Sequence, residues 1–504
     1  MVISIVTLAT ASDGDSCKAM SRTFSRRARN PLPTLLFLIS FPSVLLAGVW
    51  RFADSQDNSD PPPIDAIADL PETTPQTPVL SSRRSPLVLA RESSSTAFEI
   101  GLRPLGGAVL PGSCAAISVD GILSLSDGID TPVTPASTLK VIVAAVALEV
   151  LGPDTVFTTE VRADLRGGTA GTLYLVGGGD PMLAASWYPN DANLSRFPQQ
   201  PATSLDLLAD AVIQQGLQKV SGNVVGDSTR YDAELYPPNW PIQFRTIEGG
   251  PIGGLVVNDN AVLNQPTRAL DPGIGAASEF ARLLLERGVT ISGAATSGQA
   301  PVGVATIARI SSAPLVDIVG AMLGTSDNNT AEMLLKEIGF QARGQGSRAA
   351  GISVVEERLR AWGIPLTGWA MVDGSGLSRD NKVTCSSFLA VLERFRTGDQ
   401  LVSRMPVAGV SGTLSTFFIG GPLEGRLFGK TGTLTGVKGL VGFVDTQSGS
   451  IMRIVVLLEG EGVSQEENFR PIWEKFLADA VGDFASGPSA EEIAPLAPLG
   501  TTAP

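Results

Sequence analysis

The sequence predicts a mixed α/β (α+β) fold in which helices flank a central antiparallel sheet. Three apolar runs that follow one another after short turns are typical of an antiparallel meander, and they cover residues 427–434, 439–445 and 451–458. A strongly helical run extends over residues 136–151 and stops at a glycine. Residues 161–310 lie between these elements and alternate short β-rich runs with Gly, Pro and Asp turns. They are therefore expected to form one or more inserted β-rich domains.

The remaining elements can be placed in order along the chain. Residues 114–120 and 122–125 have the pattern of a hairpin that joins the sheet carrying the Lys430 strand. A helix is expected inside the insertion, over residues 204–215. Three further helical segments should complete the sheet domain, the last of them packing across the sheet: residues 315–323, 329–338 and 470–481.

The composition narrows the chemistry that the chain can perform. The 504 residues include 0 histidines, which excludes a Ser-His-Asp triad and a Cys-His dyad and removes the commonest metal ligand. Acidic residues (50) outnumber basic residues (37), and the formal net charge is −13. This balance argues against a nucleic-acid partner. A serine nucleophile in this chain would need a lysine as its main alternative base.

A candidate nucleophile and base lie at the start of the predicted helix. Ser137 and Lys140 are three residues apart in Ser-Thr-Leu-Lys, so their side chains share one helix face. Ser137 lies in the first turn, where unpaired N–H groups favour a developing negative charge. Residues 141–148 are apolar on every side of the helix, which predicts burial. Because burial lowers the pKa of a lysine, Lys140 can serve as a neutral amine base.

A second motif, Ser-Asp-Asn, lies 189 residues beyond the first. Ser326 and Asn328 are two residues apart, so they point the same way in an extended or turn-like loop. The serine hydroxyl can relay a proton, and the Asn328 amide can hold a substrate peptide group.

A third motif, Lys-Thr-Gly, lies on the predicted strand 427–434. Lys430, with Thr431 beside it, offers a cation for a terminal carboxylate. Gly432 allows another backbone to lie close to the strand edge. The backbone N–H groups of Ser137 and Thr433 are candidates for an oxyanion hole.

The three ordered motifs resemble those of the penicillin-recognising serine enzymes, which include D,D-peptidases and serine β-lactamases. The long spacing between the first two motifs resembles the penicillin-binding protein 4 type, the D-alanyl-D-alanine carboxypeptidase/endopeptidase family (peptidase family S13). Several other segments resemble that family: residues 135–140, 175–181, 373–379 and 405–413. One departure is Ser411, where many members are expected to have an aspartate.

The resemblance implies a β-lactamase/transpeptidase-like domain and an acyl-enzyme on Ser137. Lys140 would accept the serine proton, and Ser326 would pass a proton to the leaving nitrogen. Peptidoglycan stem peptides would be the substrates, β-lactam antibiotics would be covalent inhibitors, and no cofactor or metal is implied. By the same resemblance, Arg379 and Asp227 are candidate substrate-binding residues.

The sequence leaves two questions open: the role of Asp227, and whether the cysteines pair. The Asp227 carboxylate could pair with the free ammonium of a stem-peptide diamino acid, or it could cap its own turn. An oxidising exterior permits a disulfide between Cys114 and Cys385. Both flank starts of apolar elements, however, and we expect buried free thiols.

Two other functions fit the same motifs. A serine β-lactamase shares the acylation step but needs an element that activates water, and no Glu-x-x-Leu-Asn-like segment is placed for that role. An inactive cell-wall-binding protein on the same fold would not need Ser137, Lys140 and Lys430 intact.

The N-terminal region predicts an exported, membrane-attached enzyme. Residues 31–50 contain 20 positions without a charge and could cross a bilayer as a helix of about 30 Å. Basic residues precede this segment and acidic residues follow it, which leaves the long C-terminal part outside the cytoplasm.

The expected organisation therefore has seven parts. In chain order they are a cytoplasmic N-terminus (1–30), a transmembrane signal anchor (31–50), a disordered linker (51–95), the first part of the catalytic domain (96–160), the insertion (161–310), the second part of the catalytic domain (311–485) and a disordered tail (486–504).

Overall fold

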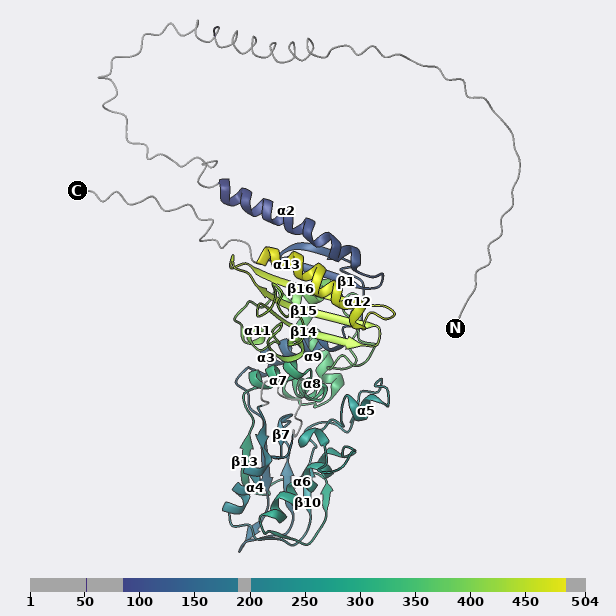
Figure 1. Cartoon of the computed structure of the whole chain (residues 1–504). Coiled ribbons are helices and arrows are strands. Elements are labelled where there is room, and N and C mark those ends of the chain that lie inside the picture. The colour runs from purple at the N-terminus through teal and green to yellow at the C-terminus, as the bar shows by residue number, and fades with distance from the viewer. Residues whose placement is uncertain (1–50, 52–84, 189–200, 486–504) are drawn as a thin grey trace, which may run out of the picture. The chain divides into compact units, whose positions relative to one another are not determined.

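The computed structural model describes residue 51 and the ranges 85–188 and 201–485 (Figure 1). The chain divides into two units, Met1–Pro78 and Val79–Pro504, and the sheets and helices of the fold belong to the second. The predicted segments 1–30, 31–50 and 486–504 lie outside the described residues. Among the helices of the described ranges, none combines the length and apolar character needed to cross a membrane.

A five-stranded antiparallel sheet forms the centre of the catalytic domain. Its strand order is β14-β15-β16-β1-β2, so the hairpin near the start of the domain pairs with the last strand of the meander (Figure 1). The strands are β1 (Cys114–Val119), β2 (Ile122–Asp127), β14 (Leu427–Leu434), β15 (Val437–Asp445) and β16 (Ile451–Glu459). The predicted hairpin and meander are confirmed.

Helices cover both faces of this sheet, because alternate side chains of its strands are buried on opposite sides. On one face, Ala115 and Ile117 pack with α2 (Ser85–Ala108), α12 (Glu466–Arg470), the π-helical η6 (Pro471–Leu477) and α13 (Ala478–Ala485). The predicted helix over residues 470–481 therefore packs across the sheet, as expected, although it forms part of a longer helical segment.

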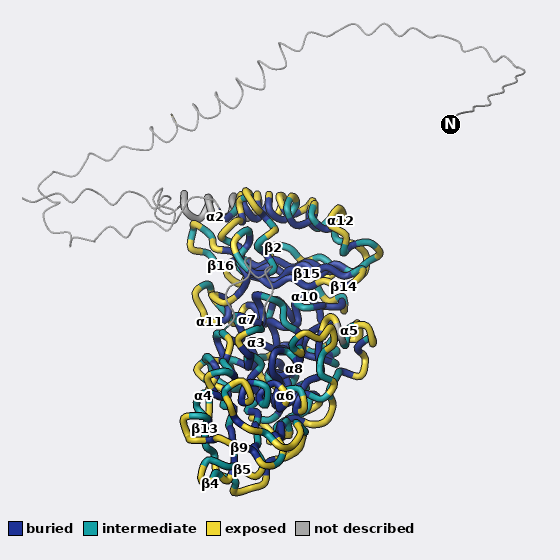
Figure 2. The backbone as a smooth tube through the Cα atoms, turned by 60° about the horizontal axis from the view of Figure 1, so that its bottom comes forward, coloured by how far each residue is buried: buried dark blue, intermediate teal, exposed yellow. Residues whose placement is uncertain are grey.

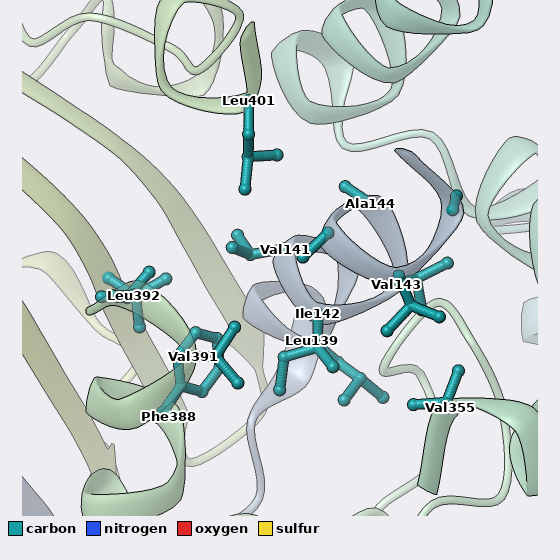
Figure 3. Packing of buried hydrophobic residues seen from close by; sticks show 14 of the residues in the cluster. Leu139, Val141, Ile142, Val143, Ala144, Val355, Phe388, Val391, Leu392 and Leu401 are labelled. Carbon is teal, nitrogen blue, oxygen red and sulfur yellow. The ribbon is translucent and has the colours of Figure 1, made fainter. Parts of the chain in front are cut away.

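The second face of the sheet carries the helices that hold the candidate nucleophile. Val441 and Val455 of the sheet share one core with this group of helices. The group comprises α3 (Lys140–Leu151), α7 (Leu315–Thr325), α8 (Asn328–Arg343), α9 (Arg348–Ala361), α10 (Cys385–Leu392) and α11 (Gln400–Ser403). Figure 3 shows α3 enclosed by Phe388 and Val391 of α10, Val355 of α9 and Leu401 of α11. The central position of α3 is visible as a dark blue segment in Figure 2.

The insertion forms a second domain with its own core, which contains Leu173, Leu205 and Phe280. Its main sheet has the order β12-β10-β6-β3-β13 and a smaller one has the order β11-β9-β5-β4, with β7 and β8 paired separately. The strands are β3 (Thr158–Arg162), β4 (Leu165–Arg166), β5 (Thr169–Ala170), β6 (Leu173–Val176), β7 (Leu183–Ala184), β8 (Thr203–Ser204), β9 (Lys219–Val220), β10 (Val224–Asp227), β11 (Thr290–Ile291), β12 (Ala295–Ser297) and β13 (Thr306–Ser311). Its helices are α4 (Leu205–Gln214), α5 (Phe244–Ile247) and α6 (Pro272–Glu286).

The end of the predicted linker is helical, which corrects the expected disorder over residues 51–95. Residues 85–95 belong to α2. The later part of this helix is anchored by Phe98, Leu102 and Leu105, which are buried at a helical spacing against the sheet. Because helix formation is cooperative, a docked segment supports further turns beyond its contacts.

The prediction of free thiols is wrong. Cys114 and Cys385 form a disulfide, and their Cα atoms are 6.0 Å apart. The first begins strand β1 and the second begins helix α10, two elements that pack against each other although 271 residues separate the cysteines. Tertiary packing therefore decided a pairing that the local sequence left open.

Candidate active site

Ser137 lies in a short 3₁₀ turn directly before the buried helix. The turn, η2 (Ala136–Leu139), precedes α3, so the predicted helix 136–151 begins with a tighter turn than expected. Ser137 Oγ lies 2.9 Å from Lys140 Nζ, which confirms that the two side chains share one face. Ser137 is half-buried and Lys140 is fully buried. The hydroxyl can therefore meet a substrate, while the amine is shielded from water.

Lys140 Nζ has two further hydrogen-bond partners, and both are carbonyl oxygens that can only accept a hydrogen bond. Its Nζ donates to Asn328 Oδ1 at 2.7 Å and to the carbonyl oxygen of Ser375 at 2.6 Å. A neutral amine has two N–H donors and one lone pair. If the two N–H groups serve Asn328 and Ser375, the lone pair faces the Ser137 hydroxyl. This geometry suits a general base.

Burial and nearby charges act on the pKa of Lys140 in opposite directions. Burial lowers its pKa to about 8, while the charges of Asp327, Asp373, Glu332 and Glu248 oppose that shift. The predicted lowering of this pKa is confirmed. Only the neutral amine can accept a proton, so the lowered pKa increases the share of molecules that are competent for general-base catalysis near neutral pH.

The Ser-Asp-Asn motif forms the junction between two helices. Ser326 follows α7 in a left-handed conformation, with φ of 64°. Asp327 caps α8 by accepting from the Thr330 N–H at 2.6 Å. Asn328 is the first residue of α8, and its Nδ2 donates to the Glu248 carbonyl oxygen at 2.7 Å. The last contact fixes which side of the amide faces Lys140.

The Lys-Thr-Gly motif supplies a second lysine–serine pair. Lys430 Nζ lies 2.9 Å from Ser326 Oγ and donates to the Thr431 carbonyl oxygen at 2.7 Å. The Lys430 side chain is fully buried. Its pKa is well below the ordinary value because of burial and, secondarily, the nearby charges of Lys140 and Lys438.

The rest of this motif lies beside the nucleophile. A Cβ on Gly432 would lie 2.7 Å from the Pro135 carbonyl oxygen and 3.1 Å from the Ser137 nitrogen, so only glycine permits this approach. Strand β14 therefore runs directly against the backbone of the nucleophile turn. Thr433 is exposed, and its hydroxyl accepts from Lys438 Nζ at 3.0 Å.

Asp227 and Arg379 are not part of this hydrogen-bonded group. Asp227 is nearly buried at the end of β10. Its carboxylate accepts from the Thr229 N–H and hydroxyl at 3.0 and 2.6 Å and from the Ala300 N–H at 2.8 Å. These contacts match the turn-capping alternative. Arg379 is exposed, and its guanidinium donates to the Thr435 carbonyl oxygen beyond the end of β14. Substrate binding by either residue stays a prediction.

Sequence reasoning gave no role to Ser375 or to the loop around it. The loop comprises residues 373–378, and we call it the 375 loop. Asp373 organises it by accepting from the Gly376 and Ser378 N–H groups at 2.8 and 2.7 Å. Trp240 of the insertion donates to the same carboxylate at 2.9 Å. A Gly-rich segment with an aspartate at its start signals such a turn, but it does not reveal which carbonyl faces the lysine.

A cavity of about 200 Å³ is lined in part by Asp327 of the Ser-Asp-Asn junction. Its walls come from both domains and include Met182, Tyr188, Asp259, Asp327 and Met333. Its lining includes none of Ser137, Lys140 and Lys430, so this cavity is separate from the hydrogen-bonded site.

The arrangement has the geometry that serine acyl transfer with a lysine base requires. A half-buried hydroxyl touches a buried amine of lowered pKa, and a strand edge passes beside the serine backbone N–H.

Comparison with known proteins agrees with this class. The family model for the D-Ala-D-Ala carboxypeptidase 3 (S13) family matches residues 120–273 and 251–479. A carboxypeptidase of Mycobacterium tuberculosis is 30% identical over 359 residues, which cover 66% of this chain and 72% of the relative. A D-alanyl-D-alanine carboxypeptidase of an Actinomadura species is 30% identical over 407 residues, covering 64% of this chain and 72% of the relative. The chain belongs to the S13 family.

The fold also matches a solved structure of the penicillin-binding protein 4 type. The crystal structure of penicillin binding protein 4 from Haemophilus influenzae has a TM-score of 0.64 and 22% sequence identity. The match covers 75% of this chain and 98% of that protein.

Proposed function

We propose that Ser137 is the nucleophile through which this serine-type D-alanyl-D-alanine carboxypeptidase/endopeptidase cleaves peptidoglycan stem peptides. The contact between Ser137 Oγ and Lys140 Nζ, at 2.9 Å, carries the proposal, because the two other partners of Lys140 leave its lone pair for the serine proton. Family membership supports the reaction class.

In the acylation step, Ser137 Oγ bonds to the carbonyl carbon between two D-alanines, and its proton passes to Lys140 Nζ. The C–N bond then breaks, and the proton that Lys140 accepted passes to the leaving amine through the Ser326 hydroxyl, which touches Lys430. The product is an ester on Ser137. Water hydrolyses that ester and releases the shortened peptide. Cleavage of a cross-link is the same reaction with a branched leaving group.

Substrate binding falls to groups on both sides of the nucleophile. Asn328 Oδ1 is engaged by Lys140, and the remaining capacity of its amide can orient the substrate peptide. The Thr431 hydroxyl, which donates to Thr413 at 3.0 Å, and the exposed Thr433 flank the strand edge where a terminal carboxylate would bind. A bound carboxylate would favour the charged form of the buried Lys430 amine.

β-Lactams should acylate the same serine. Penicillin binding protein 4 from Haemophilus influenzae, which shares the fold, also has a crystal structure in complex with a β-lactam, with a TM-score of 0.58 to this chain. A β-lactam presents an acyl group that Ser137 can attack, but its leaving nitrogen stays attached to the adduct.

Intact mass spectrometry tests the nucleophile. Wild-type protein incubated with benzylpenicillin should gain one adduct that maps to Ser137, and the adduct should persist for far longer than one peptidase turnover. Ser137→Ala should show neither adduct nor release of D-alanine, whereas Ser326→Ala should still form the adduct more slowly. Labelling of Ser137→Ala in the cleft would refute the assignment, and rapid loss of the wild-type adduct would indicate a β-lactamase.

We infer that residues 31–50 attach the enzyme to the membrane with its catalytic domain outside the cytoplasm. The uncharged length of this segment and the basic residues before it support the inference. Full-length protein should remain in the membrane fraction after an alkaline wash, and a variant without residues 31–50 should be released. Equal release of both proteins would contradict it.

A further inference from the structure

The Ser375 carbonyl oxygen is a partner of Lys140 that belongs to none of the three motifs. It accepts from Lys140 Nζ at 2.6 Å. The next residue, Gly376, has φ of 83°, and a Cβ there would lie 1.9 Å from the Ala136 carbonyl oxygen. Ala136 itself has φ of 47°, which is uncommon for a residue with a side chain. The 375 loop therefore touches both the base and the residue that precedes the nucleophile.

One carboxylate holds this loop in place. Glu332 is fully buried on α8, and its Oε1 accepts from the Gly374 and Ser375 N–H groups, each at 2.9 Å. These two N–H groups belong to the two peptide planes that directly precede the Ser375–Gly376 plane. The carbonyl of that last plane faces Lys140, and its N–H donates to Asp373, so Glu332 and Asp373 hold the loop from both sides of Ser375. Charge-assisted hydrogen bonds of this kind are stronger than neutral ones.

The position of Glu332 on its helix links it to Asn328. The two residues are four apart and share one face of α8. Asn328 supplies one acceptor to Lys140 directly, and Glu332 fixes the other acceptor through the 375 loop. One helix face therefore sets both N–H directions of the base, and with them the direction of its lone pair.

The second oxygen of Glu332 ties this arrangement to the insertion. Glu332 Oε2 accepts from Arg348 Nε at 3.1 Å, and Arg348 is itself nearly buried, with 3% of its side chain exposed. The Arg348 guanidinium also pairs with Glu234 of the insertion. The buried charge of Glu332 is thus compensated, which a carboxylate at this depth requires.

We propose that Glu332 is a positioning residue that holds the 375 loop and thereby aims the lone pair of Lys140 at Ser137. The proposal rests on the role of Lys140 as the base in the proposed function. Glu332 does not touch the reacting atoms, and it acts through the Ser375 carbonyl.

The test compares acylation rates of three variants. In Glu332→Ala the loop loses both anchoring hydrogen bonds, and we expect the second-order rate of acylation by a fluorescent penicillin to fall about 100-fold. In Glu332→Gln an amide oxygen can still accept from the loop, so the rate should recover to within about tenfold of wild type. Rates are expressed per folded molecule, with folding measured by thermal unfolding.

Glu337→Ala is the matched control. Glu337 is buried on the same helix and pairs with Arg230 of the insertion at 2.6 Å, but none of its hydrogen bonds reaches the 375 loop. Its loss removes a buried ion pair between the same two domains. We expect a comparable loss of thermal stability and an acylation rate within about threefold of wild type.

The pH profile separates positioning from general destabilisation. Glu332 raises the pKa of Lys140, so Glu332→Gln should move the acid limb of the acylation profile to lower pH, whereas Glu337→Ala should not. Acylation of Glu332→Ala at the wild-type rate, an equal loss in Glu337→Ala, or an unmoved limb in Glu332→Gln would each overturn the proposal. Failure of the underlying function would look different, because wild-type protein would then carry no adduct on Ser137.

Discussion

The two buried lysines of the site have the same immediate partner and opposite electrostatic surroundings. Lys140 and Lys430 are both fully buried, and each lies 2.9 Å from a serine hydroxyl. Burial lowers the pKa of Lys140 to about 8, and the charges of nearby carboxylates oppose that shift. Burial, together with the charges of two nearby lysines, lowers the pKa of Lys430 well below its ordinary value. Two amines with the same local geometry therefore differ in their electrostatic surroundings.

The difference suggests how two lysines can take separate roles in a site without histidine, one in proton transfer and one in anion binding. The first lysine is poised to exchange a proton near neutral pH, which suits general-base catalysis. The second has no carboxylate partner among the residues that the structure describes, and it becomes charged most readily when an anion arrives. A substrate that ends in a carboxylate would supply that anion.

The largest expected effect comes from removal of the first amine. Lys140→Ala should lower the second-order rate of penicillin acylation by about 1,000-fold, because the chain offers no histidine to take the serine proton. The rate is measured with a fluorescent penicillin, and circular dichroism checks the fold. Retention of more than a tenth of the wild-type rate would show that another group is the base.

Removal of the second amine should have a smaller and more selective effect. Lys430→Met keeps an unbranched side chain of similar length but cannot become charged. We expect kcat/KM to fall about 100-fold for a peptide that ends in D-Ala-D-Ala and by less than tenfold for the same peptide as its C-terminal amide. Similar losses on both substrates would mean that Lys430 serves proton transfer through Ser326 and not carboxylate recognition.

The comparison also predicts a pH profile. Since only neutral Lys140 can accept the serine proton, the acylation rate should rise about tenfold for each pH unit below about 8 and become constant above it. The profile is measured with a penicillin from pH 6 to 10 on folded wild-type protein. A rate that is already constant at pH 6 would place the pKa of the base far below this value.

The smallest effect is expected at Asp227, a charge of the insertion that lies outside both lysine–serine pairs. Asp227→Asn should lower kcat/KM by less than about threefold, and equally for stem peptides with and without a free diamino-acid ammonium, because both carboxylate oxygens already accept local hydrogen bonds. A selective loss on the peptide with the free amine would instead establish recognition by this carboxylate.

Local sequence determined the elements that carry the site. The three apolar runs separated by turns predicted the meander, and strand β14 has the predicted bounds 427–434. The apolar run 141–148 indicated a buried helix, and the spacing of Ser137 and Lys140 gave their contact. These features depend on helix and strand geometry over a few residues, which the local sequence encodes.

Tertiary structure alone decided the partners that come from distant segments. The disulfide joins cysteines 271 residues apart. Glu332 contacts the 375 loop from helix α8, and 43 residues separate it from Ser375. Besides capping its own turn, Asp227 accepts from the Ala300 N–H, 73 residues away. Hydrogen bonds of this kind depend on how whole elements pack. The sequence by itself therefore determined which residues could perform the chemistry, and the packing of two domains around α8 decided how the base is held.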